Sequence, residues 1–231
     1  MGATETTDAS VADSDLIDEV AEADERLAEM PAIETFKWAV ERFGDDVVVA
    51  CSFQDSVIID LAVKAKQSIE VLFLDTRFHF KETLEFVETC REFFDPLNLT
   101  VLKPGPDAAP WPCGSERCCE TRKVMPINKH LEGRKAWITG LKRVDNKDRQ
   151  DAPIVAYDAA RGLVKINPFA AWTDDDVNAY IEENGLPEHP LIKQGYLSIG
   201  CAPVTRPVGE GEDARSGRWS DSEKTECGLH I

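Results

Sequence analysis

Apolar residues follow two different spacings along the chain, and each spacing predicts its own kind of element. Short, nearly continuous apolar runs are typical of strands that are buried on both faces of a sheet. Such runs cover residues 46–52, 69–76, 99–102 and 136–140. Elsewhere, apolar residues recur every three or four positions, which predicts amphipathic helices. The helical segments are residues 33–43, 55–65 and 81–94.

The alternation of these strands and helices predicts an α/β fold. We expect a doubly wound, mostly parallel, Rossmann-like sheet with helices on both faces. In folds of this kind, a ligand binds at the carboxyl ends of the strands. Polar segments that follow predicted strands are therefore candidates for a binding site. They are residues 52–56, 75–77 and 140–143.

The chain divides into an N-terminal tail, the α/β domain and a C-terminal segment. Residues 1–28 are rich in Ala, Asp, Glu, Ser and Thr, which predicts an acidic, flexible tail leading into the first helix. The α/β domain spans residues 29–190, and Thr173 is the expected N-cap of a helix that ends near residue 183. Residues 191–231 are predicted to be mostly loop.

Composition narrows the choice of partners and compartment. The chain has 231 residues, 42% of them hydrophobic, which is enough for one domain with a substantial core. Its net charge of −17 argues against general nucleic-acid binding, although a locally basic pocket could still accept an anionic small molecule. No apolar run is long enough to span a membrane and no signal peptide is evident, so we expect a cytoplasmic protein without a membrane partner.

Cysteine usage favours metal binding or thiol chemistry over a disulfide framework, because seven cysteines occur without a secretion signal. Cys51 and Cys90 lie in apolar patterns and are interpreted as packing residues. Cys227 lies close to the C-terminus, where backbone is usually mobile. A thiol at this position could attack a substrate in a pocket and then meet a separate reductant. The alternative is a tail cysteine without function.

Two adjacent cysteines, Cys118 and Cys119, form the second thiol feature. Neighbouring side chains on a helix do not face each other, so the pair is poorly placed to bind a single metal ion. Two irons of a multinuclear cluster would suit it better. The alternative is a pair of small buried residues.

The polar loop at residues 52–56 joins a predicted strand to a predicted helix, where backbone N–H groups can bind an anion. It is not a Walker loop, because it lacks the glycines and the Lys-Ser/Thr pair. Ser52, Gln54 and Asp55 are candidate substrate-binding residues, although Ser52 would serve equally well as a helix cap.

Several further segments resemble the motifs of the assimilatory adenylyl-sulfate reductases. They are ERCCETRKVMPI at 116–127, WITGLKR at 137–143, KQGYLSIGCAP at 193–203, RSGRW at 215–219 and KTECGLH at 224–230. The resemblance covers roughly residues 30–231, with the motifs in the order of the family. The loop at 52–56 is similar in part to the phosphate loop of the adenine-nucleotide alpha hydrolase-like proteins, but without its glycines.

The resemblance implies a fold of the adenine-nucleotide alpha hydrolase-like type and a reductive activity. Enzymes of this family bind adenosine 5′-phosphosulfate, reduce its sulfonyl group to sulfite and release AMP. Cys227 matches their nucleophile, whose thiolate attacks the sulfur and forms an S-sulfocysteine. Thioredoxin, or glutaredoxin, then attacks this adduct and frees sulfite, which agrees with a thiol that must act in two places.

The resemblance also implies a [4Fe–4S] cluster, which the family holds with the tandem cysteines and a later Cys-x-x-Cys. Cys118, Cys119 and Cys201 match three of these ligands, but Val204 stands at the fourth position and cannot bind iron. The fourth ligand could be a non-protein group, or Cys113 could substitute for it. The cluster could also be labile or absent.

A phosphosulfate anion needs cations, and the resemblance indicates where they are. Lys123 matches the family lysine beside the cluster. Guanidinium groups suit bidentate contact with phosphate and sulfate oxygens. The candidates are Arg143, Arg206, Arg215 and Arg218. At the second strand end, Asp75 and Thr76 are expected to meet the ribose or the adenine.

Two rival functions stay open. One is reduction of 3′-phosphoadenylyl sulfate, by the branch of the family that lacks the cluster cysteines. The other is a non-catalytic, nucleotide-binding redox sensor that kept the fold and lost the activity. Retention of Cys227 with its neighbours argues against the sensor, and the three cluster cysteines argue for the unphosphorylated substrate.

Overall fold

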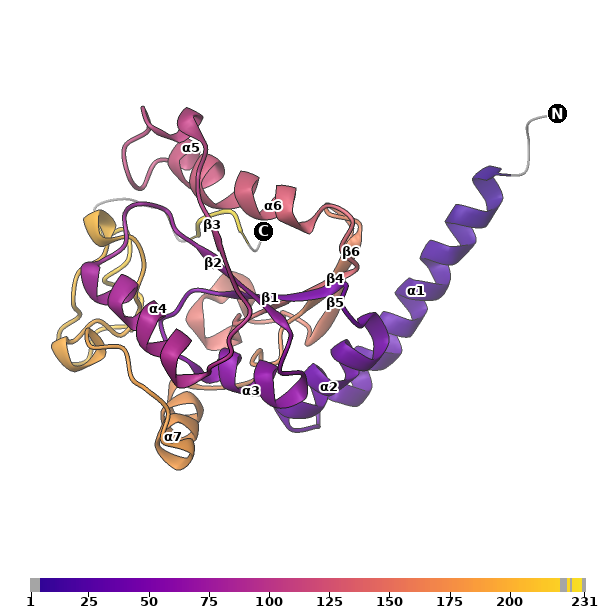
Figure 1. Ribbon diagram of the computed structural model, residues 1–231, viewed down its shortest axis with the longest axis horizontal. Helices are drawn as coiled ribbons and strands as arrows, with labels where there is room; N and C mark the ends of the chain where they lie inside the picture. Colours follow the sequence, from indigo (N-terminus) through magenta and orange to yellow (C-terminus); the bar gives the residue numbers. More distant parts are fainter. Residues whose placement is uncertain (1–4, 221–223, 225, 230–231) are drawn as a thin grey trace.

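The structure, a computed structural model, confirms the α/β fold with a six-stranded sheet (Figure 1). It describes residues 5–220, 224 and 226–229, with side chains from residue 14 onward. The spatial strand order is β3-β2-β1-β4-β6-β5, and only β5 runs antiparallel to its neighbour. The strands are β1 (Val47–Cys51), β2 (Glu70–Leu74), β3 (Leu99–Leu102), β4 (Ala136–Thr139), β5 (Val155–Asp158) and β6 (Leu163–Ile166).

Alternate residues of the central strands enter two separate cores, one on each face of the sheet. Val47 and Val49 belong to the larger core, which α2, α3 and α4 cover. Val48 lies in the smaller core on the other face, together with Ile127 and Leu131 of α6. Figure 1 shows α5 and α6 on one side of the sheet and α2 and α3 on the other.

The helices lie close to where the apolar spacing predicts them. They are α2 (Ala32–Phe43), α3 (Val57–Ala65), α4 (Lys81–Phe93), α5 (Glu116–Cys119), α6 (Met125–Leu131) and α7 (Asp174–Asn184). Thr173 caps α7 as expected: its side chain accepts from the N–H of Asp176, whose carboxylate in turn accepts from the N–H of Thr173.

The N-terminal segment differs from the prediction. A flexible tail is expected over residues 1–28, but α1 (Glu5–Leu27) is helical from Glu5 onward. Val20, Ala23 and Leu27 recur every three or four residues and are buried, so the second half of α1 has one apolar side that packs on the domain. Asp24 of this helix also accepts a hydrogen bond from the N–H of Val155 in β5, at 3.0 Å.

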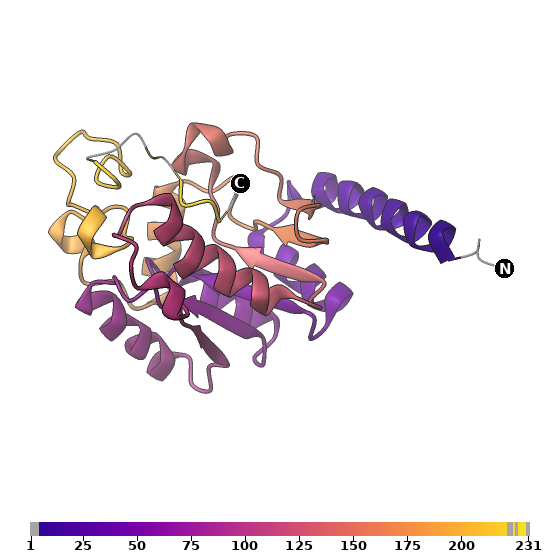
Figure 2. The ribbon, with the colours of Figure 1, turned by 90° about the horizontal axis from the view of Figure 1, so that it is seen from above.

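The C-terminal segment is mostly loop, as predicted, with short 3₁₀ turns at Ile192–Gln194 and Ala202–Val204. Figures 1 and 2 place the greater part of this segment at the end of the molecule opposite to α1, whereas its last described residues return to the middle, where Leu229 packs on the smaller core. Within the described part of the chain, no helix has the length and apolar character needed to cross a membrane.

Candidate active site

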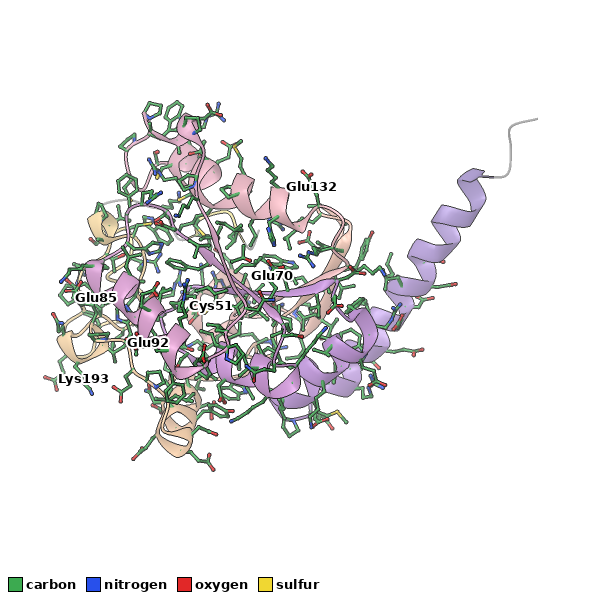
Figure 3. The ribbon with its side chains drawn as sticks, in the orientation of Figure 1. Cys51, Glu70, Glu85, Glu92, Glu132 and Lys193 are labelled. Atoms are coloured by element: carbon green, nitrogen blue, oxygen red, sulfur yellow. The ribbon has the colours of Figure 1, made fainter. Side chains whose placement is uncertain are left out.

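A cavity of about 210 Å³ lies at the carboxyl ends of β1, β2 and β4, where a doubly wound sheet is expected to bind its ligand. Most of the predicted site residues line it. They are Ser52, Gln54, Asp55, Thr76, Lys123, Cys201, Arg215, Arg218 and Cys227. In Figure 3, Cys51 at the end of β1 lies in the middle of the molecule, whereas Glu85, Glu92 and Lys193 lie at its periphery.

The loop after β1 is held in its shape by contacts with distant segments. Phe53 has φ of +56°, and its ring packs edge-on against Phe73 with centroids 5.2 Å apart. This buried contact keeps a bulky residue in a backbone conformation that usually favours glycine. The side-chain oxygen of Gln54 accepts the N–H of Ile199 at 2.9 Å, which ties the loop to the C-terminal segment.

Asp55 caps the first turn of α3, because its carboxylate accepts the N–H of Val57 at 3.1 Å. Burial raises the pKa of this carboxyl group, partly offset by that hydrogen bond and by Lys142. Ser52 remains exposed at the rim, and its hydroxyl accepts the N–H of Gln54 at 3.4 Å. The loop therefore presents polar side chains to the cavity from a fixed backbone.

At the end of β2, the two predicted residues have different places. Thr76 lines the cavity, and its hydroxyl lies 3.5 Å from the sulfur of Cys201. Asp75 is not among the lining residues. Its carboxylate instead accepts the N–H of Arg77 at 3.0 Å, which stabilises the turn that leaves the strand.

Two half-buried cations, Lys123 and Arg218, line the cavity. Lys123 lies on the π-helical turn Glu120–Val124, an insertion often found at functional sites. Burial alone would lower the pKa of Lys123, but Cys227 and Cys201 outweigh it and the pKa is raised. Burial lowers the pKa of Arg218, whose guanidinium stacks 4.6 Å from the Trp219 ring centroid.

Gly200 makes room for Arg218. A Cβ atom added at Gly200 would lie 2.3 Å from the guanidinium carbon of Arg218, well inside van der Waals contact. The guanidinium also donates to the carbonyl of Ile199 at 3.3 Å. A residue without a side chain thus leaves room for the Arg218 guanidinium in the cavity wall.

Two of the predicted arginines do not line the cavity. Arg143 points away and donates to the carbonyl of Ala152 at 2.8 Å, and Arg206 is exposed and pairs with Glu212 at 3.0 Å. Motif position identified these residues, but it carries no information on the direction of a side chain. Lys142 and Arg149, which sequence reasoning missed, line the cavity instead.

The tail carrying Cys227 is docked, with the half-buried thiol in the cavity wall. On one side of it, Glu226 accepts from Arg149 at 2.7 Å and from Asn146 at 3.0 Å. On the other side, Leu229 packs against the smaller hydrophobic core, and its carbonyl accepts from Arg161 at 3.3 Å. Thr225 and His230 of the same motif lie outside the described residues.

A second, smaller pocket adjoins the cavity and brings four cysteines together. They are Cys113, Cys118, Cys119 and Cys201. Thr76, Lys123 and Arg218 line both spaces and so form a shared wall. Among the described residues, no group of three or more His, Cys, Asp or Glu side chains is arranged to hold a single metal ion.

The remaining cysteines behave as packing residues. Cys51 and Cys90 are buried in the larger core, and burial raises the pKa of each thiol, to about 12 for Cys90. In contrast, a side-chain hydrogen bond with Cys113 lowers the pKa of Cys201 to about 4, assisted by Lys123 and Thr76. Cys201 therefore differs from the two packing cysteines in chemistry as well as in place.

Comparison with known proteins yields one family and a consistent set of relatives. Residues 46–207 match the phosphoadenosine phosphosulfate reductase domain. The adenosine 5′-phosphosulfate reductase of Mycobacteroides abscessus is 44% identical over 213 residues, covering 88% of this chain and 90% of that protein. The protein of the same name from Streptomyces coelicolor is 43% identical over 217 residues, covering 90% and 92%.

Solved structures agree on the architecture. The phosphate complex of phosphoadenylyl-sulfate reductase from Candida auris superposes with a TM-score of 0.71 at 26% identity, covering 81% of this chain and 96% of that one. The FMN adenylyltransferase of Candida glabrata, in complex with FAD and pyrophosphate, has a TM-score of 0.58 at 13% identity. It covers 84% of this chain and 74% of that one, and at this identity the likeness concerns the fold alone.

Proposed function

The chain belongs to the phosphoadenosine phosphosulfate reductase domain family, and from this we propose that it reduces adenosine 5′-phosphosulfate to sulfite and AMP. The observation that carries the proposal is the docking of Cys227 into a cavity that also contains Lys123, Arg215 and Arg218. A nucleophilic thiol and three cations meet there at the carboxyl ends of the strands, which is where this fold binds nucleotides. The names of the relatives at 43–44% identity favour the unphosphorylated substrate.

The cavity suits a nucleotide that ends in two joined anionic groups. Arg215 and Arg218 can contact phosphate and sulfate oxygens with planar, bidentate guanidinium groups. Lys123 contributes a point charge from the wall that it shares with the cysteine pocket. Together they neutralise charge on a substrate that the protein, with its net charge of −17, would otherwise repel.

In the first step, the thiolate of Cys227 attacks the sulfur of the sulfonyl group. A sulfur–sulfur bond forms, the bond between sulfur and the bridging phosphate oxygen breaks, and AMP leaves with that oxygen. Lys123 lines the same cavity as Cys227, and its positive charge favours the thiolate form of a nearby cysteine. The product on the protein is S-sulfocysteine.

In the second step, a dithiol reductant of the thioredoxin or glutaredoxin class supplies two electrons. Its thiolate attacks the Cys227 sulfur and expels sulfite, and its second thiol then resolves the mixed disulfide and restores the Cys227 thiol. The docked tail holds this sulfur in the cavity wall, so the tail must leave the cavity before the reductant reaches it.

An iron–sulfur cluster fits the smaller pocket, because thiols are the donor set that such clusters require and Lys123 and Arg218 are there to balance their charge. Cys118, Cys119 and Cys201 are the residues that would hold it. When bound, the cluster would cross-link two segments of the chain and place its charge beside Lys123. The cytoplasmic location expected from the sequence is compatible with cysteines that remain free thiols.

The test is sulfite release by protein purified without oxygen, with thioredoxin as donor, comparing adenosine 5′-phosphosulfate with its 3′-phosphorylated form. We expect a preference for the unphosphorylated compound and no sulfite from Cys227→Ser, with AMP binding retained. A preference for the 3′-phosphorylated form would overturn the substrate assignment. Sulfite release by Cys227→Ser at the wild-type rate would overturn the mechanism. Mass spectrometry of the protein with substrate but no reductant should find the sulfonate on Cys227.

A further inference from the structure

The fourth position of the family's cluster motif is Val204, and the structure places this residue against a neighbouring loop. Val204 is half-buried and lines the cysteine pocket. A Cβ atom added at Gly114 would lie 2.9 Å from the Val204 Cγ1 atom, so the backbone of Gly114 packs directly on the valine. Gly114 also has φ of +93°, a conformation that suits glycine. The loop that contacts Val204 therefore carries Cys113 into the same pocket.

Cys113 is fixed relative to the tandem cysteines. The hydroxyl of Ser115 donates to the carbonyl of Pro112 at 2.9 Å and accepts the N–H of Cys118 at 3.2 Å. The ammonium of Lys224 links the Cys113 loop to α5. It donates to the carbonyl of Gly114 at 3.3 Å and lies 3.1 Å from the Cys119 sulfur. These contacts hold the loop on the N-terminal turn of α5.

Cys113 also reaches the cysteine contributed by the C-terminal segment. The two thiols line the same small pocket and interact with each other there. Cys201 is positioned independently, since the N–H of the next residue, Ala202, donates to the carbonyl of Phe78 at 2.7 Å and the Cys201 sulfur contacts Thr76. Four thiols from three segments thus converge on one pocket, the number that a [4Fe–4S] cluster takes from protein.

From this convergence we propose that Cys113 is the fourth cysteine ligand of the iron–sulfur cluster, in place of the residue that the motif has at 204. The inference rests on the cluster of the proposed function. Cys113 would give up its thiol proton on binding iron and would be a ligand of the same cluster as Cys201. Val204 becomes a packing residue that supports the Cys113 loop through Gly114.

The experiment compares variants of the full chain after anaerobic purification and chemical reconstitution with iron and sulfide. Iron and acid-labile sulfide are measured per chain, and electron paramagnetic resonance reports the type of cluster. Cys90→Ala is the matched control, because Cys90 is buried in the larger core and absent from the cysteine pocket. We expect wild type and Cys90→Ala to hold about four irons per chain.

Cys113→Ser should lose a quarter or more of this iron, or show the resonance of a three-iron cluster, and Cys113→Ser/Val204→Cys should regain the wild-type content. Wild-type iron content and spectrum in Cys113→Ser would overturn the assignment of Cys113 while leaving the proposed cluster intact. Wild-type protein without iron would overturn the cluster itself, and the sulfite assay would then decide separately whether the reductase function stands.

A measurement on the wild-type chain guards against a variant that fails to fold. Cys113 is half-buried, so a free thiol there should react with an alkylating reagent. Mass spectrometry should find Cys113 unmodified in the cluster-loaded protein and modified after iron is removed with a chelator. Equal modification of Cys113 in both samples would overturn the proposal. Equal protection in both would overturn it too, because the protection would then not depend on the cluster.

Discussion

Glu226 and Arg149 form an ion pair that anchors the residue immediately before Cys227. Arg149 donates from Nη2 to the Glu226 Oε2 atom at 2.7 Å, and its Nε atom lies 2.6 Å from Oε1. The side chains of Arg149 and Glu226 are only 10% and 8% exposed. Solvent screens such a pair poorly, so loss of the ion pair should change the position of Cys227.

Replacing Glu226 with Gln should therefore slow the attack of Cys227 on the substrate. A hydrogen bond between charged groups contributes about 1.5–3 kcal/mol, which corresponds to a loss of roughly tenfold or more in the docked population if docking is marginal. Single-turnover release of AMP measures this step without the reductant. The control is Glu210→Gln, since Glu210 is exposed in the same segment. Equal rates in both variants would contradict the anchoring role.

Leu229 is the second anchor, and its truncation should expose the nucleophile. Leu229→Ala removes apolar contact with the smaller core, at a cost of about 1–2 kcal/mol for a half-buried side chain. We expect Cys227 to be alkylated faster in this variant and AMP release to be slower. Leu197→Ala, at an exposed leucine of the C-terminal segment, should change neither rate. Unchanged alkylation of Cys227 in Leu229→Ala would show that the contact does not hold the tail.

Gly200→Ala should weaken substrate binding without unfolding the protein. The new methyl group collides with the end of the Arg218 side chain, which must move, whereas the backbone at Gly200 is not in the left-handed region. We expect KM for adenosine 5′-phosphosulfate to rise about tenfold, because a buried charge-assisted contact is lost. Gly105→Ala is the control, since no atom lies within 4 Å of the added Cβ there. A KM equal to that of wild type would place Arg218 outside the binding site.

Because of His189, the free energy of unfolding should decrease in mild acid. Burial lowers the pKa of this imidazole from 6.5 to about 4. Between these values the unfolded chain binds a proton that the folded protein does not, so the free energy of unfolding decreases as the pH falls through that window. The folded imidazole uses both nitrogens, one 3.0 Å from the Thr83 hydroxyl and one accepting the N–H of Leu191 at 3.2 Å.

Urea unfolding at about pH 7.5 and about pH 5 tests this expectation. Wild type should lose more stability between the two than His189→Asn, whose side-chain oxygen can still accept from Leu191. Subtracting the two losses cancels the contribution of the carboxylates, which both proteins share. Identical losses would mean that His189 is not the group responsible.

The sequence predicts the central sheet well, because β1, β2, β3 and β4 are short apolar runs between clear helices. It does not reveal the β5–β6 hairpin. Tyr157, Asp158 and Lys165 interrupt the apolar pattern of these strands, and only the turn at Gly162, with φ of +67°, marks the pairing. The sequence does not reveal helix α1 either. Its acidic composition is typical of a flexible tail, and the apolar side is formed by only a few residues.

The sequence predicts which residue types form the candidate site. It predicts less well which side chains point into the cavity. Lys123, Arg218 and Cys227 line the cavity as the motifs indicate. Arg143 does not, whereas its neighbour Lys142 does, because consecutive residues point in different directions. The meeting of Cys113 with Cys201 spans 88 positions of sequence and depends on tertiary contacts that no local pattern encodes.

The docked tail has a consequence for selectivity among electron donors. With Glu226 and Leu229 in place, the sulfur of Cys227 lines the cavity, and the cavity walls restrict the directions from which a thiol can attack the proposed adduct. A protein that binds the released tail can hold it away from the sheet long enough for exchange, whereas a chance collision cannot. In the proposed mechanism, the two anchors thus favour a donor protein that binds the released tail over a small thiol.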